Sequence, residues 1–391
     1  MKKGEKYLIS FGGWYQRTTL HLSEIYDFLN DCESSLPLSK EKLESLWKSL
    51  GMKKVTKEAE KFEVVKAITK EGIILKYYED GLHTLEIESD DIKKAEELLR
   101  KYYEEKLAPA INYIFSLGAP TPKILSKIVD QHPIAIRVIT SNPNSLQIEK
   151  EFGEVYSKIA YRGIVVYKTK KFIFIALSES QKKVFVPLSE MQIFFREFKN
   201  QLHKYLNIHR TSWEYIDSII AKKQIRGKEI DRDLRNLEGY QRTIGLIRFR
   251  INQMNSYIST RALISKDAKI NEALLTLFEY RFEDLKNTLE YVKELWNATY
   301  DYTESAVSTL SELNKSAEST SLESLKIITS IGVVSLILGY LSAESYPTFS
   351  KIGISSFIII IALAFLFEKI LKIWGNRKKY EVEFAELKKD L

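Results

Sequence analysis

Five small or hydroxylated residues near the C-terminus recur at spacings of three and four, which on a helix places them on one face: Thr329, Gly332, Ser335, Gly339 and Ser342. This stripe has two interpretations. Small residues let helices in a membrane pack closely, with hydroxyl groups bonding across the contact. Alternatively, the stripe lines a pore formed by several copies, where small side chains leave room for water and ions.

The sequence has no recognisable catalytic pattern. It contains no phosphate loop, no H-E-x-x-H, no G-x-S-x-G and no C-x-x-C, and its five histidines are scattered. The single cysteine, Cys32, excludes a disulfide framework within one chain and is consistent with a reducing compartment. We therefore expect no enzyme and no covalently bound cofactor.

Two uncharged runs carry and follow the stripe. Residues 327–343 and 352–367 contain no charged side chain over 17 and 16 residues, at the short end of what crosses a bilayer. The second run includes FIIIIALAFLF, apolar on every face, and a cluster of lysine and arginine residues follows it. These features predict two transmembrane helices in 327–374, an outer loop at 344–351 and a basic cytoplasmic tail at 375–391. A buried helical hairpin inside a globular core is the alternative.

The charges on either side of the two runs predict an orientation. By the positive-inside rule the basic tail is cytoplasmic, and a hairpin then places everything before residue 327 in the cytoplasm as well. The N-terminal stretch MKKGEKYLISFGGWYQR has an apolar run too short for a signal peptide. The sequence thus predicts a multi-pass protein of the plasma membrane, with the lipid bilayer as a partner and with both its N- and C-termini in the cytoplasm.

A very long helix is expected to lead into the first run. From Ser265, which is typical of a helix N-cap, to Leu341 there is no proline, and the first glycine is Gly332. At 1.5 Å per residue such a helix is about 110 Å long. Along it, residues alternate by four and three as in a heptad seam, and the predicted stalk seam consists of Thr299, Thr303, Ala306, Leu310 and Leu313. The seam indicates packing against copies of itself or against neighbouring helices, and 189–326 is predicted to form a helical hairpin and this stalk.

Residues 1–188 mix predicted strands and helices, which indicates a cytoplasmic α+β domain of a sensing type. Strands are expected in KFEVVKAI, GIILKYY, HTLEIE, PIAIRVIT and GIVVYKTKKFIFIAL, whereas the two glycines of FGGWYQR are expected in a turn. The chain carries a net charge of +7. Two interpretations stay open for one group of basic residues, a patch for an anionic ligand or ordinary surface: Arg162, Lys168, Lys170 and Lys171.

The order of these parts resembles the CorA superfamily of divalent-cation channels. Its members have a cytoplasmic α/β domain, helices that fold back, one very long helix that enters the membrane, a short outer turn, a second span and a basic tail. In sequence the likeness is confined to ESLKIITSIGVVSLILGYLSAESYP and the second run. Tyr340 corresponds to the tyrosine of the family's YGMNF signature. Its glycine, methionine and asparagine are replaced here by Leu341, Ser342 and Ala343.

The resemblance implies a fold and a function. The implied fold is an α/β cytoplasmic domain followed by long stalk helices and a two-helix transmembrane hairpin, assembled as a homopentamer around a central path. The implied function is a cation channel with its pore lined by the first transmembrane helix and with Tyr340 and Glu344 at the pore mouth. Mg²⁺ or another divalent cation is implied as the permeant or regulatory ion.

Two other functions stay open beside the channel. CorA-like proteins without the signature also occur beside type III CRISPR systems, where they look like membrane effectors gated by a nucleotide messenger. The cytoplasmic domain would then bind an anionic or nucleotide ligand. The third interpretation is a membrane scaffold without a pore. No direct binding of DNA is expected.

Overall fold

The computed structural model of the chain describes residues 5–14, 22–59, 62–115, 133–222, 224–341 and 377–381, with isolated residues between 359 and 373. The described chain divides into two compact units. The first, the sheet unit, combines residues 1–208 with 246–294, and the second, the helical unit, combines residues 209–245 with 295–391. Three long helices contribute to both units, so the units do not follow one another along the sequence.

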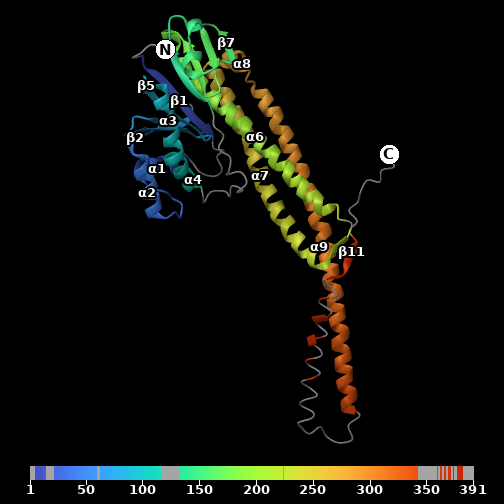
Figure 1. Cartoon of the computed structure of the whole chain (residues 1–391). Coiled ribbons are helices and arrows are strands. Elements are labelled where there is room, and N and C mark those ends of the chain that lie inside the picture. Colours follow the sequence, from blue (N-terminus) through green and yellow to red (C-terminus); the bar gives the residue numbers. More distant parts are fainter. Residues whose placement is uncertain are drawn as a thin grey trace, which may run out of the picture. The chain divides into compact units, whose positions relative to one another are not determined.

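A nine-stranded sheet is the framework of the sheet unit (Figure 1). From one edge to the other the strands are β2 (Met52–Ala59), β3 (Glu63–Thr69), β4 (Ile74–Tyr78), β5 (Leu82–Ser89), β1 (Tyr7–Trp14), β6 (Ile134–Ile139), β9 (Phe172–Leu177), β8 (Ile164–Lys168) and β7 (Ser157–Tyr161). Neighbouring strands are antiparallel except for β6 and β9, which run parallel. The strands expected in KFEVVKAI, GIILKYY, HTLEIE, PIAIRVIT and GIVVYKTKKFIFIAL are present, and the mixed α and β composition expected for this region is confirmed.

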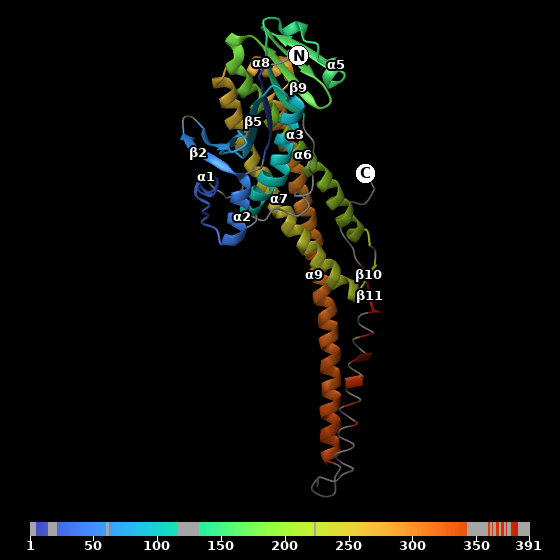
Figure 2. The same ribbon diagram turned by 60° about the vertical axis from the view of Figure 1, so that its left-hand side comes forward.

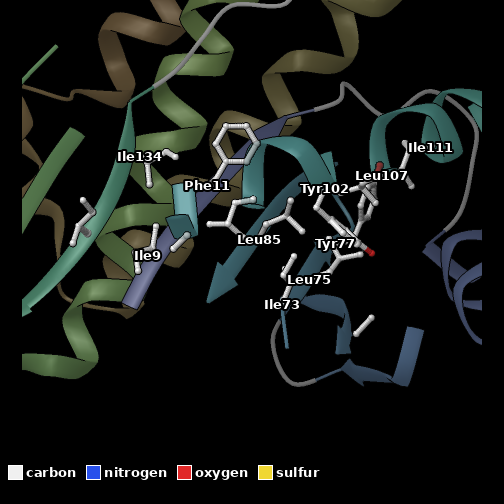
Figure 3. Close-up of a cluster of buried hydrophobic side chains, with 14 of the residues drawn as sticks. Ile9, Phe11, Ile73, Leu75, Tyr77, Leu85, Tyr102, Leu107, Ile111 and Ile134 are labelled. Carbon is white, nitrogen blue, oxygen red and sulfur yellow. The ribbon is translucent and has the colours of Figure 1, made fainter. Parts of the chain in front are cut away.

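Helices cover one face of the sheet and form its larger core. They are α1 (Leu22–Asp31), α2 (Lys40–Leu50), α3 (Ile92–Tyr102), the π-helical turn η1 (Tyr103–Leu107) and α4 (Ala108–Ile114). Alternation along β1 directs Ile9 and Phe11 to this face, where they meet Leu85 and Leu75 of neighbouring strands (Figure 3). Asp91 caps the N-terminus of α3, where its side chain accepts the backbone N–H of Lys94. Burial of this apolar face holds the helices on the sheet.

The opposite face of the sheet packs against later parts of the chain. Leu8 and Ile173 lie in a second core with Leu188 of α6 (Phe185–Ile220) and Leu277 of α8 (Asn271–Phe278). Between β6 and β9 lie the short elements η4 (Pro143–Ser145) and α5 (Glu149–Phe152), while η5 (Glu179–Val184) joins β9 to α6. The sheet is therefore covered on both faces.

The glycine pair of FGGWYQR lies inside strand β1 and not in a turn. Gly12 pairs with Thr84 and Gly13 with His83 of β5. A Cβ atom on Gly12 would lie 2.3 Å from the carbonyl oxygen of His83, closer than any side chain can come. The expected turn is wrong because the sequence pattern does not reveal that the neighbouring backbone approaches this closely.

The single helix expected from Ser265 to Leu341 is divided into three. α7 (Gly227–Asp267) ends two residues after Ser265, α8 follows, and α9 (Phe282–Leu341) runs unbroken for 60 residues (Figure 2). The breaks occur at Lys269 and Glu279, which take positive φ angles of 56° and 59° although neither is glycine. Burial of Leu274 and Leu277 of α8 in the second core accompanies these left-handed residues.

The predicted transmembrane hairpin is corrected by the structure. Among the described residues, no helix is long and apolar enough to cross a membrane. Within α9, the uncharged run covers residues 327 to 341, where the described helix ends, and it includes Thr329 and Ser330. A spanning helix needs about 20 mostly apolar residues. The second run, 352–367, and the loop 344–351 lie largely or wholly outside the described residues. The predicted membrane class and the multi-pass location in the plasma membrane are corrected with the hairpin.

The helical unit contains the last third of α6, the first half of α7 and most of α9. Aromatic rings join its helices, because Trp213 of α6 stacks on Tyr302 of α9 with centroids 4.6 Å apart, and Tyr215 of α6 stacks on Tyr240 of α7 at 4.5 Å. Part of the predicted basic tail forms the strand β11 (Lys379–Glu381), which pairs with β10 (Gln224–Arg226) in the turn between α6 and α7.

Candidate functional site

The predicted pore residues lie on or beyond the end of α9. Thr329 is exposed, and a Cβ atom on Gly332 would meet nothing within 4 Å. The side chains of Ser335, Gly339 and Tyr340 of α9 are outside the described part of the structure, as are the whole residues Ser342 and Glu344.

The predicted stalk seam is buried within a single chain. Thr299, Thr303, Ala306 and Leu310 have no exposed surface, and Leu313 is half-buried. The two threonine hydroxyls donate to carbonyls one turn earlier on α9, Thr299 to Leu295 at 2.8 Å and Thr303 to Thr299 at 2.7 Å. The seam thus packs against the chain's own helices, the second of the two arrangements that its heptad spacing allowed.

The basic residues expected to attract an anion do not form one patch. Arg162, in the turn between β7 and β8, pairs with Glu272 at 3.0 Å. Lys168, at the other end of β8, lies over the ring of Phe278, and burial lowers its pKa. Lys170 and Lys171 are exposed in the next turn. Since one strand separates Arg162 from the others, the structure favours ordinary surface for this group.

Lys171 nevertheless lines a groove beside α3. This groove has a volume of about 610 Å³ and four basic and five acidic residues in its wall: Lys93, Arg100, Lys101, Lys171, Glu96, Glu97, Glu104, Glu105 and Glu151. Arg100 pairs with Glu96 at 3.0 Å, and the Lys93 ammonium lies over the Phe152 ring. Opposite charges that alternate along one groove have no strong preference for an anion.

A second groove, the strand-end groove, opens where the two parallel strands finish. Its volume is about 790 Å³ and its wall consists of Glu5, Tyr7, Val138, Ile139, Thr140, Ser141, Leu146, Ser178, Glu179 and Ser180. The groove is placed by the parallel pairing of β6 with β9, which continues to the bond from the Thr140 N–H to the Leu177 carbonyl at 3.0 Å. Ligands of sheets with parallel strands commonly bind at this carboxyl edge.

Hydroxyl and carboxylate groups dominate the polar wall of the strand-end groove. Tyr7 donates its hydroxyl to Glu5 at 3.2 Å, and the hydroxyls of Ser178 and Ser180 are 2.9 Å apart. Glu179 is mostly exposed and pairs with Lys182 on the next turn of η5. Val138, Ile139 and Leu146 supply the apolar part of the wall. Among the described residues, the wall contains no basic side chain, histidine or cysteine, so these residues offer acceptors and hydroxyls but neither a phosphate clamp nor a catalytic base.

A buried polar network lies elsewhere on the sheet. It consists of Lys76, Tyr78, Asp80, Glu86, Glu190 and Arg261, contributed by β4, β5, the turn between them, α6 and α7. Arg261 donates two bonds to Asp80, at 2.6 and 2.7 Å, and both side chains are almost completely buried. The guanidinium also lies 4.7 Å from the centroid of the Tyr78 ring. Paired geometry of this kind is what a buried charge requires.

The remaining members of the network are connected through Glu190. Tyr78 donates its hydroxyl to Glu190 at 2.5 Å, and Lys76 lies 2.8 Å from Glu86 and 3.6 Å from Glu190. Burial raises the pKa of Glu190 against the opposing effect of Lys76, and burial with the nearby Glu190 raises the pKa of Tyr78. These contacts join α6 to β4 and β5, which gives the network a structural role within the sheet unit.

Sequence reasoning missed both the groove and the network. The groove had a signal, because clusters of small polar residues, TSNPNS and SES, follow the two apolar strands PIAIRVI and FIFIAL. The network also had a signal in the sequence. Arg261 continues the buried series Ile251, Met254 and Ile258 of α7 at spacings of three and four, so a charged residue occupies an apolar position of the helix pattern.

Comparison with known proteins adds no assignment, since no family model, curated protein or solved structure matches this chain. The resemblance to the CorA superfamily remains a prediction from the sequence.

Proposed function

We propose that this chain is a ligand-responsive protein whose sheet unit binds a small molecule of the nucleoside class in the strand-end groove. The observation that carries the proposal is the position of this groove, at the carboxyl ends of β6 and β9, with hydroxyls and two carboxylates in its wall. Its volume of about 790 Å³ is in the range of small-molecule sites.

The wall chemistry supports a ligand with neighbouring hydroxyl groups. Carboxylates such as Glu5 and Glu179 accept hydrogen bonds from vicinal hydroxyls, as an acidic residue does with a ribose in dinucleotide-binding folds. The serine and threonine hydroxyls can both donate and accept. An apolar side of Val138, Ile139 and Leu146 suits a planar ring. Because no basic residue lines the groove in the described part of the chain, we expect any phosphate of the ligand to point out of it.

The route of the chain supports a response to binding. Ser178, Glu179 and Ser180 lead directly through η5 into α6, a helix of 36 residues. A ligand that contacts these residues therefore contacts the beginning of a long helix, and ordering of η5 would stabilise its first turns. This proposal takes up the ligand-responsive interpretation of the sequence. A channel would need a spanning helix, and none lies within the described residues.

Calorimetric titration of the full-length chain tests the proposal. The probes are adenosine, guanosine, cytidine and uridine, each compared with its 2′,3′-dideoxy form. We expect saturable binding of at least one nucleoside, and a loss of about tenfold or more in affinity for its dideoxy form, because a bond to a carboxylate contributes roughly 1.5–3 kcal/mol. Equal binding of the two forms, or no binding of any nucleoside, would contradict the proposal.

Variants locate the binding. Glu5→Gln and Glu179→Gln are expected to weaken the nucleoside by about tenfold each, and Ser180→Trp is expected to abolish binding by filling the groove. Glu97→Gln, in the groove beside α3, removes a similarly exposed carboxylate and serves as the matched control. A nucleoside affinity lowered by Glu97→Gln and unchanged by Glu5→Gln would place the ligand in the other groove and refute this assignment.

A further inference from the structure

The buried polar network contains more acidic than basic groups. Its ionisable charges are three carboxylates and two cations: Asp80, Glu86, Glu190, Lys76 and Arg261. The side chains of these five residues are between 0% and 12% exposed. If all of them were ionised, the network would carry one uncompensated negative charge away from water. A buried charge without a partner is strongly unfavourable, so the network requires one further positive charge.

Each of the two cations is already bound to a carboxylate other than Glu190. Arg261 donates two hydrogen bonds to Asp80, at 2.6 and 2.7 Å, so this pair is neutral. The Lys76 ammonium lies 2.8 Å from a carboxylate oxygen of Glu86 but 3.6 Å from one of Glu190, which is beyond hydrogen-bond distance. Among the described residues, Glu190 therefore has no cation of its own.

Groups from three other elements act on Glu190. Burial raises the pKa of the Glu190 carboxyl, and the nearby Glu86 carboxylate adds to this increase. Lys76, the hydrogen bond from the Tyr78 hydroxyl and Arg261 act in the opposite direction without cancelling it. The protonated form of Glu190 is thus favoured by the same shortage of positive charge that the contacts show.

The next lysine on this face of the sheet does not supply the missing charge. Lys66 of β3 lies opposite Lys76 in the strand register, so the two side chains share a face. Lys66 pairs with Glu58 of β2, and both members of that pair are partly exposed. This outer pair is neutral and leaves the charge of the network unchanged.

We propose that the network holds one proton on Glu190 at neutral pH, and that release of this proton at higher pH loosens α6 from the sheet. With the proton bound, two carboxylates balance two cations. Once Glu190 ionises, it competes with Glu86 for Lys76, and one carboxylate is left without a cation. Glu190 lies in the first turns of α6, and its contacts with Tyr78 and Lys76 join that helix to β4. The inference is independent of the proposed ligand.

The pH dependence of stability tests the bound proton. Glu190 in the unfolded chain titrates near its ordinary pKa of 4.5, so at neutral pH the folded state binds one proton that the unfolded state does not. Stability should therefore fall as the pH rises above that value, until the folded state also loses the proton. Relative to Glu190→Gln, the folding equilibrium constant of the wild type should fall by up to about a hundredfold between pH 5 and pH 7.

Denaturation by urea at a series of pH values measures this ratio, from which the titration of all other groups cancels. Glu214→Gln removes an exposed carboxylate of the same helix and is the matched control, so its profile should follow that of the wild type. A ratio of the wild type to Glu190→Gln that does not change with pH would overturn the proposal.

Infrared spectroscopy of the folded protein counts the protons directly. The carbonyl band of a protonated carboxylic acid should be present in the wild type at pH 7 and absent from Glu190→Gln. It should be about twice as strong in Lys76→Met, because that variant leaves three carboxylates with one cation. A wild type without this band, or a band of equal strength in Glu190→Gln, would overturn the proposal. These two spectra decide the question even if Lys76→Met does not fold.

Hydrogen exchange tests the loosening of α6. After correction for the intrinsic rates, amides of residues 185–198 should exchange at least several-fold faster at pH 9 than at pH 7 in the wild type, because local opening becomes more frequent. The same amides of Glu190→Gln should show no such increase. Equal corrected rates at the two pH values in the wild type would refute the link between the proton and the helix.

Discussion

The buried polar network and the strand-end groove lie on the same sheet and both contain carboxylates and a tyrosine, but their charges are satisfied differently. Arg261 and Asp80 have 0% and 2% of their side chains exposed and bind each other through two hydrogen bonds. In the groove, the Glu179 side chain is 66% exposed although it pairs with Lys182, and Ser180 also faces solvent. Since a buried charge persists only with its partner, the network is part of the fold, whereas the exposed groups of the groove can exchange their present bonds for bonds to a ligand. The difference teaches that a ligand site is distinguished from a structural one by exposed groups that can bond to a ligand, and not by the number of its charged residues.

The largest effect is expected from breaking the buried ion pair. Asp80→Ala leaves the Arg261 guanidinium buried and unpaired, and removes the acceptor of the Leu82 N–H at 3.1 Å, so it should lower the free energy of unfolding by about 3–5 kcal/mol. The measurement is denaturation by urea.

A double variant sharpens this test. Asp80→Asn with Arg261→Met keeps the acceptor for Leu82 and removes both charges, so its loss should be clearly smaller than the sum of the two single losses. Additive losses would mean that Asp80 and Arg261 are not energetically coupled, and would contradict the structural role of the network.

The second effect concerns a buried group on the opposite face of the sheet. Burial lowers the pKa of His83 to about 4, and its ring lies between those of Tyr77 and Tyr103. In the unfolded chain the pKa is near 6.5, so below that pH the unfolded state binds a proton that the folded state does not. Stability should therefore fall as the pH is lowered from 7 to 5, by about 2 kcal/mol from this residue.

Denaturation of the wild type and of His83→Gln at a series of pH values measures this contribution. The variant will be less stable throughout, but its free energy of unfolding should decrease less between pH 7 and pH 5. If the free energies of unfolding of the two proteins fall in parallel as the pH is lowered, His83 takes up its proton in the folded state as readily as in the unfolded chain. That result would contradict the burial of His83.

The smallest effect on stability is expected in the groove. Glu179→Gln removes one partner of an exposed ion pair with Lys182, so the free energy of unfolding should change by less than about 0.5 kcal/mol. Thermal unfolding of the unliganded variant is the measurement. A large loss would place Glu179 with the structural charges and would erase the difference between the two regions.

Much of the fold was predictable from local patterns. The strands KFEVVKAI, GIILKYY and PIAIRVIT appear where alternation and apolar runs predicted them. The site was less predictable. The predicted pore residues depended on a membrane hairpin that the described chain does not support, while the groove residues Glu5 and Ser178 come from distant parts of the sequence. Only the neighbouring positions of β1, β6 and β9 bring them together.

The sequence by itself determined the properties that depend on a few neighbouring residues. These are the strand and helix periodicities, the heptad seam of α9 and the absence of the familiar catalytic motifs. Tertiary structure decided the rest. It placed Gly12 within a strand, because only the position of the His83 carbonyl excludes a side chain there. It ended α7 after Ser265, accompanied by the burial of α8, and it paired Arg261 with Asp80 across 181 positions of sequence. The free energy of such contacts comes from desolvation and close packing between distant segments, and local sequence does not contain that information.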